Sequence, residues 1–267
     1  MEASTSTVPV VMAFSGLDPT GGAGLAADIE AVASMGCHVA PLATALTVQD
    51  TRQAVEYRAV DPVLLAEQAR AVLDDMPVHA FKMGMTGSVQ VIEVLHTLVN
   101  DYPEVPLVLD PVLAAGGGGD LAGDGVVEAL RTLLLPQTTV LTPNTGEARA
   151  LAPEGDRIEA CAQELLGLGC EFVLVTDAGD DPAVVENILY GNHRRLDAWT
   201  WERLSQTYHG SGCTLAAAIA GLLAQGLEPF TAIHEAQEYT WEALKHGYGL
   251  GHGQRLPNRL FWARGED

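Results

Sequence analysis

The residues with the clearest chemical potential form a glycine turn that leads directly into an apolar run. Residues 208–214 read Tyr-His-Gly-Ser-Gly-Cys-Thr, and residues 215–224 are almost entirely apolar. The first turn of a helix has unpartnered backbone N–H groups and carries the positive end of the helix dipole, so it can bind an anion. A tight loop that merely begins a helix is the common alternative. The turn therefore predicts an anion site that also carries a thiol, on Cys213.

Two further segments place polar residues after predicted strands. The apolar run 10–14 is followed by a glycine loop over 15–24, which lacks the lysine of a P-loop and the third glycine of a dinucleotide-binding motif. Asp110 ends the apolar segment 107–109, and residues 142–148 follow the apolar segment 139–141. Because α/β sheets bind ligands at strand ends, both segments are candidates for ligand binding.

Six ordered motifs resemble those of the hydroxymethylpyrimidine/phosphomethylpyrimidine kinases of thiamine biosynthesis, a ribokinase-like family. They are SGLDPTGGAGLAAD at 15–28, TALTVQDT at 44–51, KMGM at 82–85, LDPVLAAGGGGDL at 109–121, TPNTGEA at 142–148 and HGSGCTLAAAIA at 209–220. The likeness runs from about Val10 to Gly251. It implies an ATP-dependent kinase that phosphorylates 4-amino-5-hydroxymethyl-2-methylpyrimidine and then converts the monophosphate to the diphosphate.

The resemblance assigns the phosphoryl-transfer chemistry to the glycine turn. Gly210, Ser211 and Gly212 are expected to form the anion hole, and Cys213 stands where most ribokinase-like enzymes carry a catalytic aspartate. A thiol at a helix N-terminus can have its pKa lowered well below ~8.5, so this position favours a catalytic thiolate. The alternative is a small buried cysteine that starts a packed helix.

Asp110 and Glu147 are the predicted ligands of Mg²⁺, because this cation takes few protein oxygens and keeps water and phosphate ligands. Each follows an apolar strand, where we expect the carboxylate to be exposed. Asn144 and Glu147 match the metal and phosphate motif of the family, and Asn144 and Thr176 are assigned to the nucleotide. Asn144 as N-cap with Glu147 three residues later also fits a capping box, and the two interpretations are compatible.

Gly16, Asp28, Gln49 and Met85 match the pyrimidine pocket of the family. An amide such as that of Gln49 can pair with a ring nitrogen and its neighbouring amino group, and Met85 could supply an apolar wall. The structural alternatives are an early-turn helix carboxylate for Asp28, a loop position for Gln49 and a core position for Met85. A structural ion pair is enough to explain Lys82.

One segment departs from the family pattern. After the strand 172–175, many members continue with lysine or threonine and Gly-Gly-His, whereas this chain reads Thr-Asp-Ala-Gly-Asp-Asp over 176–181. The extra carboxylates stand beside the expected nucleotide phosphates and weaken the assignment of Thr176. This departure leaves a non-catalytic pyrimidine sensor open as an alternative. A pyridoxal kinase is a second alternative, because ribokinase-like relatives with a similar glycine-cysteine turn accept that ring.

Apolar, strand-like segments alternate with helical patterns along the chain, and these elements must position the candidate site residues. Apolar segments at 10–14, 39–47, 79–83, 107–112, 138–141 and 172–176 each precede a helical pattern, which predicts a mostly parallel sheet with helices on both faces. Segments at 55–60, 185–190 and 193–196 are predicted as edge strands or hairpins. We expect a single ribokinase-like, three-layer α/β domain over 1–267, with residues 1–8 flexible and a loop at 116–119.

Composition limits the partners. A formal charge of -21, with two lysines beside 12 arginines, argues against binding to nucleic acid or to an anionic membrane. The chain shows neither a secretory signal nor an apolar helix long enough to span a bilayer, so we expect a cytoplasmic protein. Its four cysteines show no CxxC pair and are expected to be reduced. The resemblance suggests a homodimer.

Overall fold

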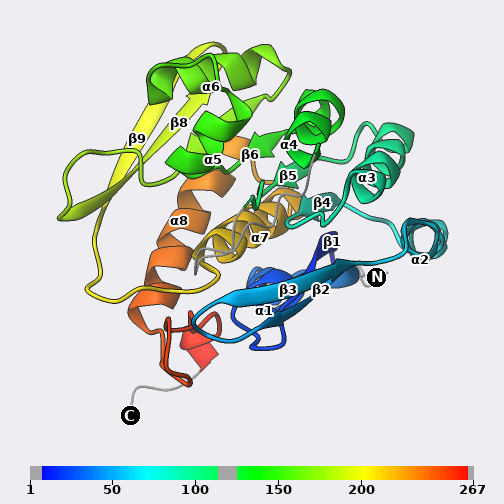
Figure 1. Ribbon diagram of the computed structural model, residues 1–267, viewed down its shortest axis with the longest axis horizontal. Coiled ribbons are helices and arrows are strands. Elements are labelled where there is room, and N and C mark those ends of the chain that lie inside the picture. Colours follow the sequence, from blue (N-terminus) through cyan, green and yellow to red (C-terminus); the bar gives the residue numbers. More distant parts are fainter. Residues whose placement is uncertain (1–7, 114–124, 264–267) are drawn as a thin grey trace, which may run out of the picture.

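The computed structural model describes residues 8–113 and 125–263. Within these ranges nine strands form one sheet in the order β3-β2-β1-β4-β5-β6-β7-β8-β9 (Figure 1). The strands are β1 Val10–Leu17, β2 His38–Gln49, β3 Ala54–Ala59, β4 Ala80–Met83, β5 Leu107–Leu109, β6 Val140–Leu141, β7 Phe172–Val175, β8 Val184–Gly191 and β9 Arg194–Glu202. The predicted loop at 116–119 and residues 1–7 of the predicted flexible segment lie outside the described residues.

The sheet is parallel in its centre and antiparallel at its edges, as the sequence pattern predicts. Strands β2, β1, β4, β5, β6 and β7 run parallel to their neighbours, whereas β3, β8 and β9 are antiparallel additions. The β8–β9 turn has positive φ at Asn192 and His193, which a type I′ hairpin requires. The strand predicted at 193–196 extends to Glu202.

The prediction that each of the six apolar segments precedes a helix is wrong for two of them. β2 turns into β3, because the Asp50 carboxylate accepts backbone hydrogen bonds from Arg52 and Gln53 and closes a short hairpin. β7 is followed by the β8–β9 hairpin. Both exceptions occur where the parallel part of the sheet ends, because an antiparallel neighbour needs no helical crossover.

Helices cover both faces of the sheet (Figure 1). They are α1 Gly24–Ser34, α2 Pro62–Asp75, α3 Val89–Asp101, α4 Val126–Ala129, α5 Thr145–Leu151, α6 Ile158–Gly167, α7 Ser211–Ala224 and α8 Pro229–Lys245. Three short helical segments also occur: Leu130–Leu134, Leu135–Gln137 and Phe261–Ala263. Local capping starts several of the helices; for example, Asp61 accepts hydrogen bonds from the backbone of Val63 and Leu64, and Pro62 is pre-set for the first turn of α2.

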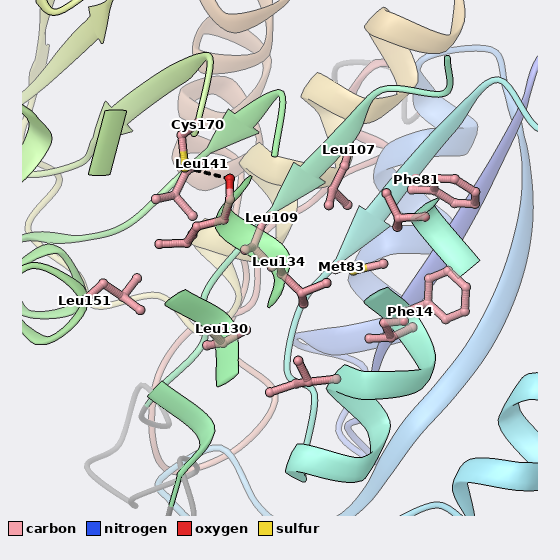
Figure 2. Packing of buried hydrophobic residues seen from close by; sticks show 14 of the residues in the cluster. Phe14, Phe81, Met83, Leu107, Leu109, Leu130, Leu134, Leu141, Leu151 and Cys170 are labelled. Atoms are coloured by element: carbon pink, nitrogen blue, oxygen red, sulfur yellow. Dashed lines mark hydrogen bonds between the residues drawn. The ribbon is translucent and has the colours of Figure 1, made fainter. Parts of the chain in front are cut away.

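Alternate side chains of each central strand enter different cores. Phe14, Phe81 and Met83 pack with Leu107 and Leu109 on the face covered by α2 to α6 (Figure 2). On the other face, small strand residues pack against α1, α7 and α8. From Thr214 to Ala224, α7 is buried on all sides, which its alanine-rich sequence permits because small side chains allow close approach. The central helix of that layer therefore begins at the predicted anion turn.

Candidate active site

The predicted site residues, with the exception of Asp28, come together in one cleft. This cleft has a volume of about 230 Å³ and lies at the carboxyl ends of the central strands, against the start of α7. The predicted residues in its wall are Gly16, Gln49, Met85, Asp110, Asn144, Glu147, Thr176, Gly210, Ser211, Gly212 and Cys213. We call it the pyrimidine-side cleft.

The glycine turn has the backbone conformation of an open helix start. Gly210 is the N-cap of α7 with φ of 85°, a left-handed conformation that favours glycine, and its carbonyl accepts a hydrogen bond from Thr214 Oγ1 at 2.7 Å. Among the described residues, no side chain caps this helix. The first N–H groups of α7 are therefore directed into the cleft without a side-chain acceptor, as an anion site requires.

Asp110 is buried, which corrects the expectation that its carboxylate is exposed. Only 4% of the residue is exposed, and its Oδ2 has no hydrogen-bond partner within the described part of the chain. Burial raises the pKa of Asp110, while the nearby charge of Lys82 and a hydrogen bond with Cys213 act in the opposite direction. A buried carboxylate oxygen without a partner is a ready ligand for a cation.

Cys213 does not have the lowered pKa that its position at a helix N-terminus predicts. Burial raises the pKa of its thiol, the neighbouring Asp110 carboxylate raises it further, and the positive charge of Lys82 compensates only in part. Desolvation and a like charge thus outweigh the helix dipole. The surroundings of Cys213 therefore favour the protonated thiol.

Asn144 and Glu147 form the capping box that the sequence allows. Asn144 Oδ1 accepts from the Glu147 N–H at 2.9 Å, and Glu147 Oε2 accepts from the Asn144 N–H at 2.9 Å. Burial, and then repulsion from Asp110, raise the pKa of Glu147 to about 7. The second effect requires the two carboxylates to be close enough to interact.

Asp110 and Glu147 together fit a magnesium ion that has few protein ligands and is otherwise bound by water and phosphate. The orphaned Oδ2 of Asp110 and the mutual repulsion of the two carboxylates both favour a bound cation. Within the described residues there is no group of three or more His, Cys, Asp or Glu side chains that could hold a metal. A cation here would take the rest of its ligands from water and phosphate, as Mg²⁺ does.

Asp28 does not line the cleft, so its assignment to the pyrimidine is corrected. Its Oδ1 lies 2.7 Å from Lys82 Nζ, its Oδ2 accepts from Ser15 Oγ at 2.6 Å, and both charged side chains are fully buried. Asp28 lies on the buried face of α1, together with Leu25, Ala31 and Val32, and so points into the protein. Burial alone would lower the pKa of Lys82, but Asp28 keeps that pKa above its usual value. The ion-pair role expected for Lys82 is confirmed.

Sequence reasoning missed Asp18 and His209, which also line the cleft. His209 Nε2 lies 2.9 Å from Asp18 Oδ2 and 3.2 Å from Gln49 Nε2. Although burial would raise it, hydrogen bonds from His209 and Thr20 hold the pKa of Asp18 well below its usual range. Asp18 lies in the motif at 15–28 and His209 in the motif at 209–220, so membership of these motifs could have identified both residues. The side chain predicted to contact the pyrimidine, Gln49, is thus held by His209, which in turn contacts Asp18.

A second, larger cleft of about 380 Å³ adjoins the first and shares Thr176, Tyr208, Ser211 and Gly212 with it. Trp201 and Trp241 contribute apolar walls. We call it the nucleotide-side cleft. Because it begins where the glycine turn ends, a group bound in one cleft can reach a group bound in the other across the start of α7.

The segment that departs from the family pattern borders the nucleotide-side cleft. Asp177 pairs with Arg203 through contacts of 2.5 Å and 3.3 Å, so its extra negative charge is locally neutralised. Among the described residues that line the two clefts, Arg203 is the only lysine or arginine. The backbone N–H of Thr176 donates to the Pro143 carbonyl and not into the cleft.

Proteins with similar sequences are thiamine-biosynthesis enzymes. The chain is 33% identical to the hydroxymethylpyrimidine/phosphomethylpyrimidine kinase of Synechococcus elongatus, over 92% of this chain and 95% of that protein. It is 34% identical to the chloroplastic thiamine biosynthetic bifunctional enzyme TH1 of Arabidopsis thaliana. The match covers 99% of this chain but only 52% of TH1, so the chain spans about half the length of that relative.

Solved structures confirm the ribokinase-like α/β fold. The pyridoxal kinase of Staphylococcus aureus in complex with ADP superposes with a TM-score of 0.87 at 25% identity, covering 97% of this chain and 96% of that chain. Phosphomethylpyrimidine kinase from Clostridium difficile superposes with a TM-score of 0.75 at 29% identity, covering 89% and 99%. The profile of the phosphomethylpyrimidine kinase family matches residues 18–258. Because this match covers most of the chain, and the shared motifs meet in one cleft, the chain belongs to the phosphomethylpyrimidine kinase family.

Proposed function

We propose that the chain is a bifunctional kinase that transfers the terminal phosphoryl group of ATP to hydroxymethylpyrimidine and then to its monophosphate. The observation that carries the proposal is that one cleft contains the uncapped start of α7, the carboxylates of Asp110 and Glu147, and the side-chain amide of Gln49. The names of relatives that match almost along their whole length support the same activity.

The two clefts divide the substrates between them. The smaller cleft offers Gln49 for the donor and acceptor edge of an aminopyrimidine, with Met85 and Gly16 as close walls. The larger cleft, of about 380 Å³, would take the nucleoside, and solved relatives are described as complexes with ADP and AMP-PCP. The phosphate chain of ATP would then cross from one cleft to the other over Ser211 and Gly212.

Phosphoryl transfer requires in-line positioning and stabilisation of charge more than covalent participation of the protein. The N–H groups at the start of α7 would hold the transferred phosphoryl group, and the dipole of α7 favours negative charge there. Mg²⁺ held by Asp110 and Glu147 would neutralise charge on the phosphates. The capping box keeps the Glu147 carboxylate beside the first turn of α5.

We assign Cys213 as the proton acceptor of the first step only. The hydroxymethyl group must lose a proton as it attacks, whereas the phosphate monoester of the second step is already largely anionic, its second pKa being near ~6. The Asp110 carboxylate is one cause of the raised pKa of Cys213. Burial is the larger cause, and neutralising the carboxylate with a cation would remove the second contribution and lower the pKa of Cys213.

We also propose a homodimer in the cytoplasm. Exposed apolar side chains gather on the β2–β3 hairpin, where Leu46, Val48 and Val55 are 51%, 58% and 70% exposed. All four cysteines are free thiols, which fits a reducing compartment. No helix in the described residues is long and apolar enough to cross a membrane. Sedimentation of the wild type and of Val55→Asp tests the dimer, which the substitution should weaken.

A side-by-side assay tests the function. Hydroxymethylpyrimidine, its monophosphate and pyridoxal are each incubated with Mg·ATP, and products are identified by mass spectrometry. We expect the pyrimidine monophosphate and diphosphate. Pyridoxal kinase is the second candidate, because the pyridoxal kinase superposes with the higher TM-score of the two solved relatives. Phosphorylation of pyridoxal alone would favour it, and no product from folded protein would favour a non-catalytic sensor.

A further inference from the structure

Arg259 is the largest fully buried side chain among the described residues, with 1% exposure. Its Nε donates to Thr214 Oγ1 at 2.8 Å, in the first turn of α7. Its Nη1 and Nη2 donate to the backbone carbonyls of Gly21 and Gly22, in the glycine loop after β1. One guanidinium therefore joins the two glycine-rich segments that form the pyrimidine-side cleft.

The contact to Thr214 reaches the anion turn itself. Thr214 Oγ1 accepts from Arg259 and donates to the carbonyl of Gly210, the N-cap of α7. Gly210 packs so tightly against the Gly22 carbonyl that a side chain at position 210 would collide with it. The position of the turn is thus fixed by Arg259, which does not line the cleft, and by the loop that Arg259 also holds.

The backbone of Arg259 is anchored as well. Its carbonyl accepts hydrogen bonds from Ser34 Oγ at 2.7 Å and from Tyr239 Oη at 2.8 Å. Its single charged partner in the described residues is Glu30, at 3.0 Å and with a side chain 40% exposed. Burying a guanidinium costs desolvation free energy, so such a group is weak support for stability by itself. Its planar, five-donor geometry is suited to fixing several acceptors relative to one another.

We propose that Arg259 is a positioning residue for phosphoryl transfer. It holds the 21–22 loop and the first turn of α7 in one rigid arrangement, so that the N–H groups of the turn keep the geometry of the anion hole. This inference rests on the proposed kinase function. Arg259 lies just beyond residues 18–258, the part of the chain that the family profile matches.

The test compares Arg259→Met and Arg259→Lys with the control Glu30→Gln. A misplacement of about 1 Å can cost on the order of 10²-fold in rate. We therefore expect kcat of both phosphorylations to fall about 10-fold to 100-fold in Arg259→Met, with KM for the pyrimidine changed less than about threefold. Arg259→Lys should recover only part of the rate, because an ammonium cannot reproduce the fork of donors. Glu30→Gln removes the ion pair but leaves the loop contacts, so its kcat should match the wild type.

A binding measurement separates this inference from the kinase proposal. Inorganic phosphate is titrated into each variant by calorimetry, and Arg259→Met should bind it about 10-fold more weakly than Glu30→Gln does. If the wild type and Glu30→Gln bind phosphate better than Arg259→Met but no product forms, the positioning role stands and the kinase proposal fails. If Arg259→Met does not fold, Arg259→Lys below its melting temperature replaces it. Wild-type kcat and phosphate affinity in the folded Arg259 variant tested, or equal losses in Glu30→Gln, would overturn the inference.

Discussion

The two clefts are built around charges in opposite ways. Beneath the pyrimidine-side cleft, Lys82 and Asp28 are both fully buried, and nearby Asp18 and His209 are 3% and 12% exposed in their side chains. At the nucleotide-side cleft, Arg203 and Asp177 are 38% and 48% exposed. Solvent screens the second pair far more than the first. The charges of Lys82 and Asp28 therefore act with little screening, whereas the charges at the nucleotide-side cleft can change at little cost.

Removing the thiol at the floor of the pyrimidine-side cleft should have the largest effect. In Cys213→Ala and Cys213→Ser, the first phosphorylation should slow by roughly 10²–10⁴-fold, the usual contribution of a general base, and the second much less. The backbone anion hole serves both steps and should persist in both variants. Single-turnover rates of the two steps measure this difference. Equal losses in both steps would mean that Cys213 shapes the helix start and does not accept the proton.

Breaking the buried pair should destabilise the protein. Lys82→Met leaves the Asp28 carboxylate buried without its cation and should lower the free energy of unfolding by about 3–5 kcal/mol, measured by urea unfolding. The double variant Lys82→Met/Asp28→Leu is the matched control and should recover most of the loss. A single variant that loses less than about 1 kcal/mol would remove the contrast between the two clefts.

Because Glu147 titrates, the Mg²⁺ concentration that the enzyme requires should depend on pH. Because the cation needs a deprotonated carboxylate, the Mg²⁺ concentration for half-maximal activity should fall roughly tenfold per pH unit as pH rises towards about 7, and then level off. Glu147→Gln keeps the capping box and loses the charge, so its Mg²⁺ requirement should be higher and independent of this titration. A wild-type requirement that does not vary between pH 5.5 and 7 would contradict the role of Glu147.

The same group predicts the sign of a stability change. Its pKa in the folded protein, about 7, is above the ordinary value of 4.5, so its contribution to stability is fully present below about pH 4.5 and is lost as pH rises through about 7. Without added metal, the wild type should therefore lose stability relative to Glu147→Gln over this interval. Thermal midpoints of both proteins at matched pH measure the difference, and added Mg²⁺ should reduce it.

The smallest effect is expected at the exposed pair. Asp177→Asn removes a carboxylate beside the nucleotide-side cleft and should lower KM for ATP by up to about fivefold, with stability changed by less than about 1 kcal/mol. Arg203→Gln should raise KM for ATP, because it removes the cation and leaves the carboxylate. Steady-state kinetics with varied ATP measures both. Shifts in the same direction would show that the charges of the pair do not act on the nucleotide.

Local patterns predicted most of the fold and much of the candidate site. Strands, helix starts and the capping box of Asn144 and Glu147 depend on residues close in sequence, and these predictions are confirmed. The errors concern properties set by distant segments. Asp28 on α1 is buried where Lys82 of β4 meets it, and the pKa of Cys213 is raised by burial and by Asp110, which is 103 residues away in the chain.

The pairing of early and late segments also decides when their contacts can form during synthesis. Asp18 and His209 are separated by 191 residues, and Gly21 and Arg259 by 238. At ~5–20 residues per second, a ribosome needs roughly 12–48 s to make the chain between the last two. Until His209 is made the first loop lacks both partners, and it lacks its arginine partner throughout the interval. The contacts that join the first loop to the start of α7 are thus completed by almost the last part of the described chain to be made.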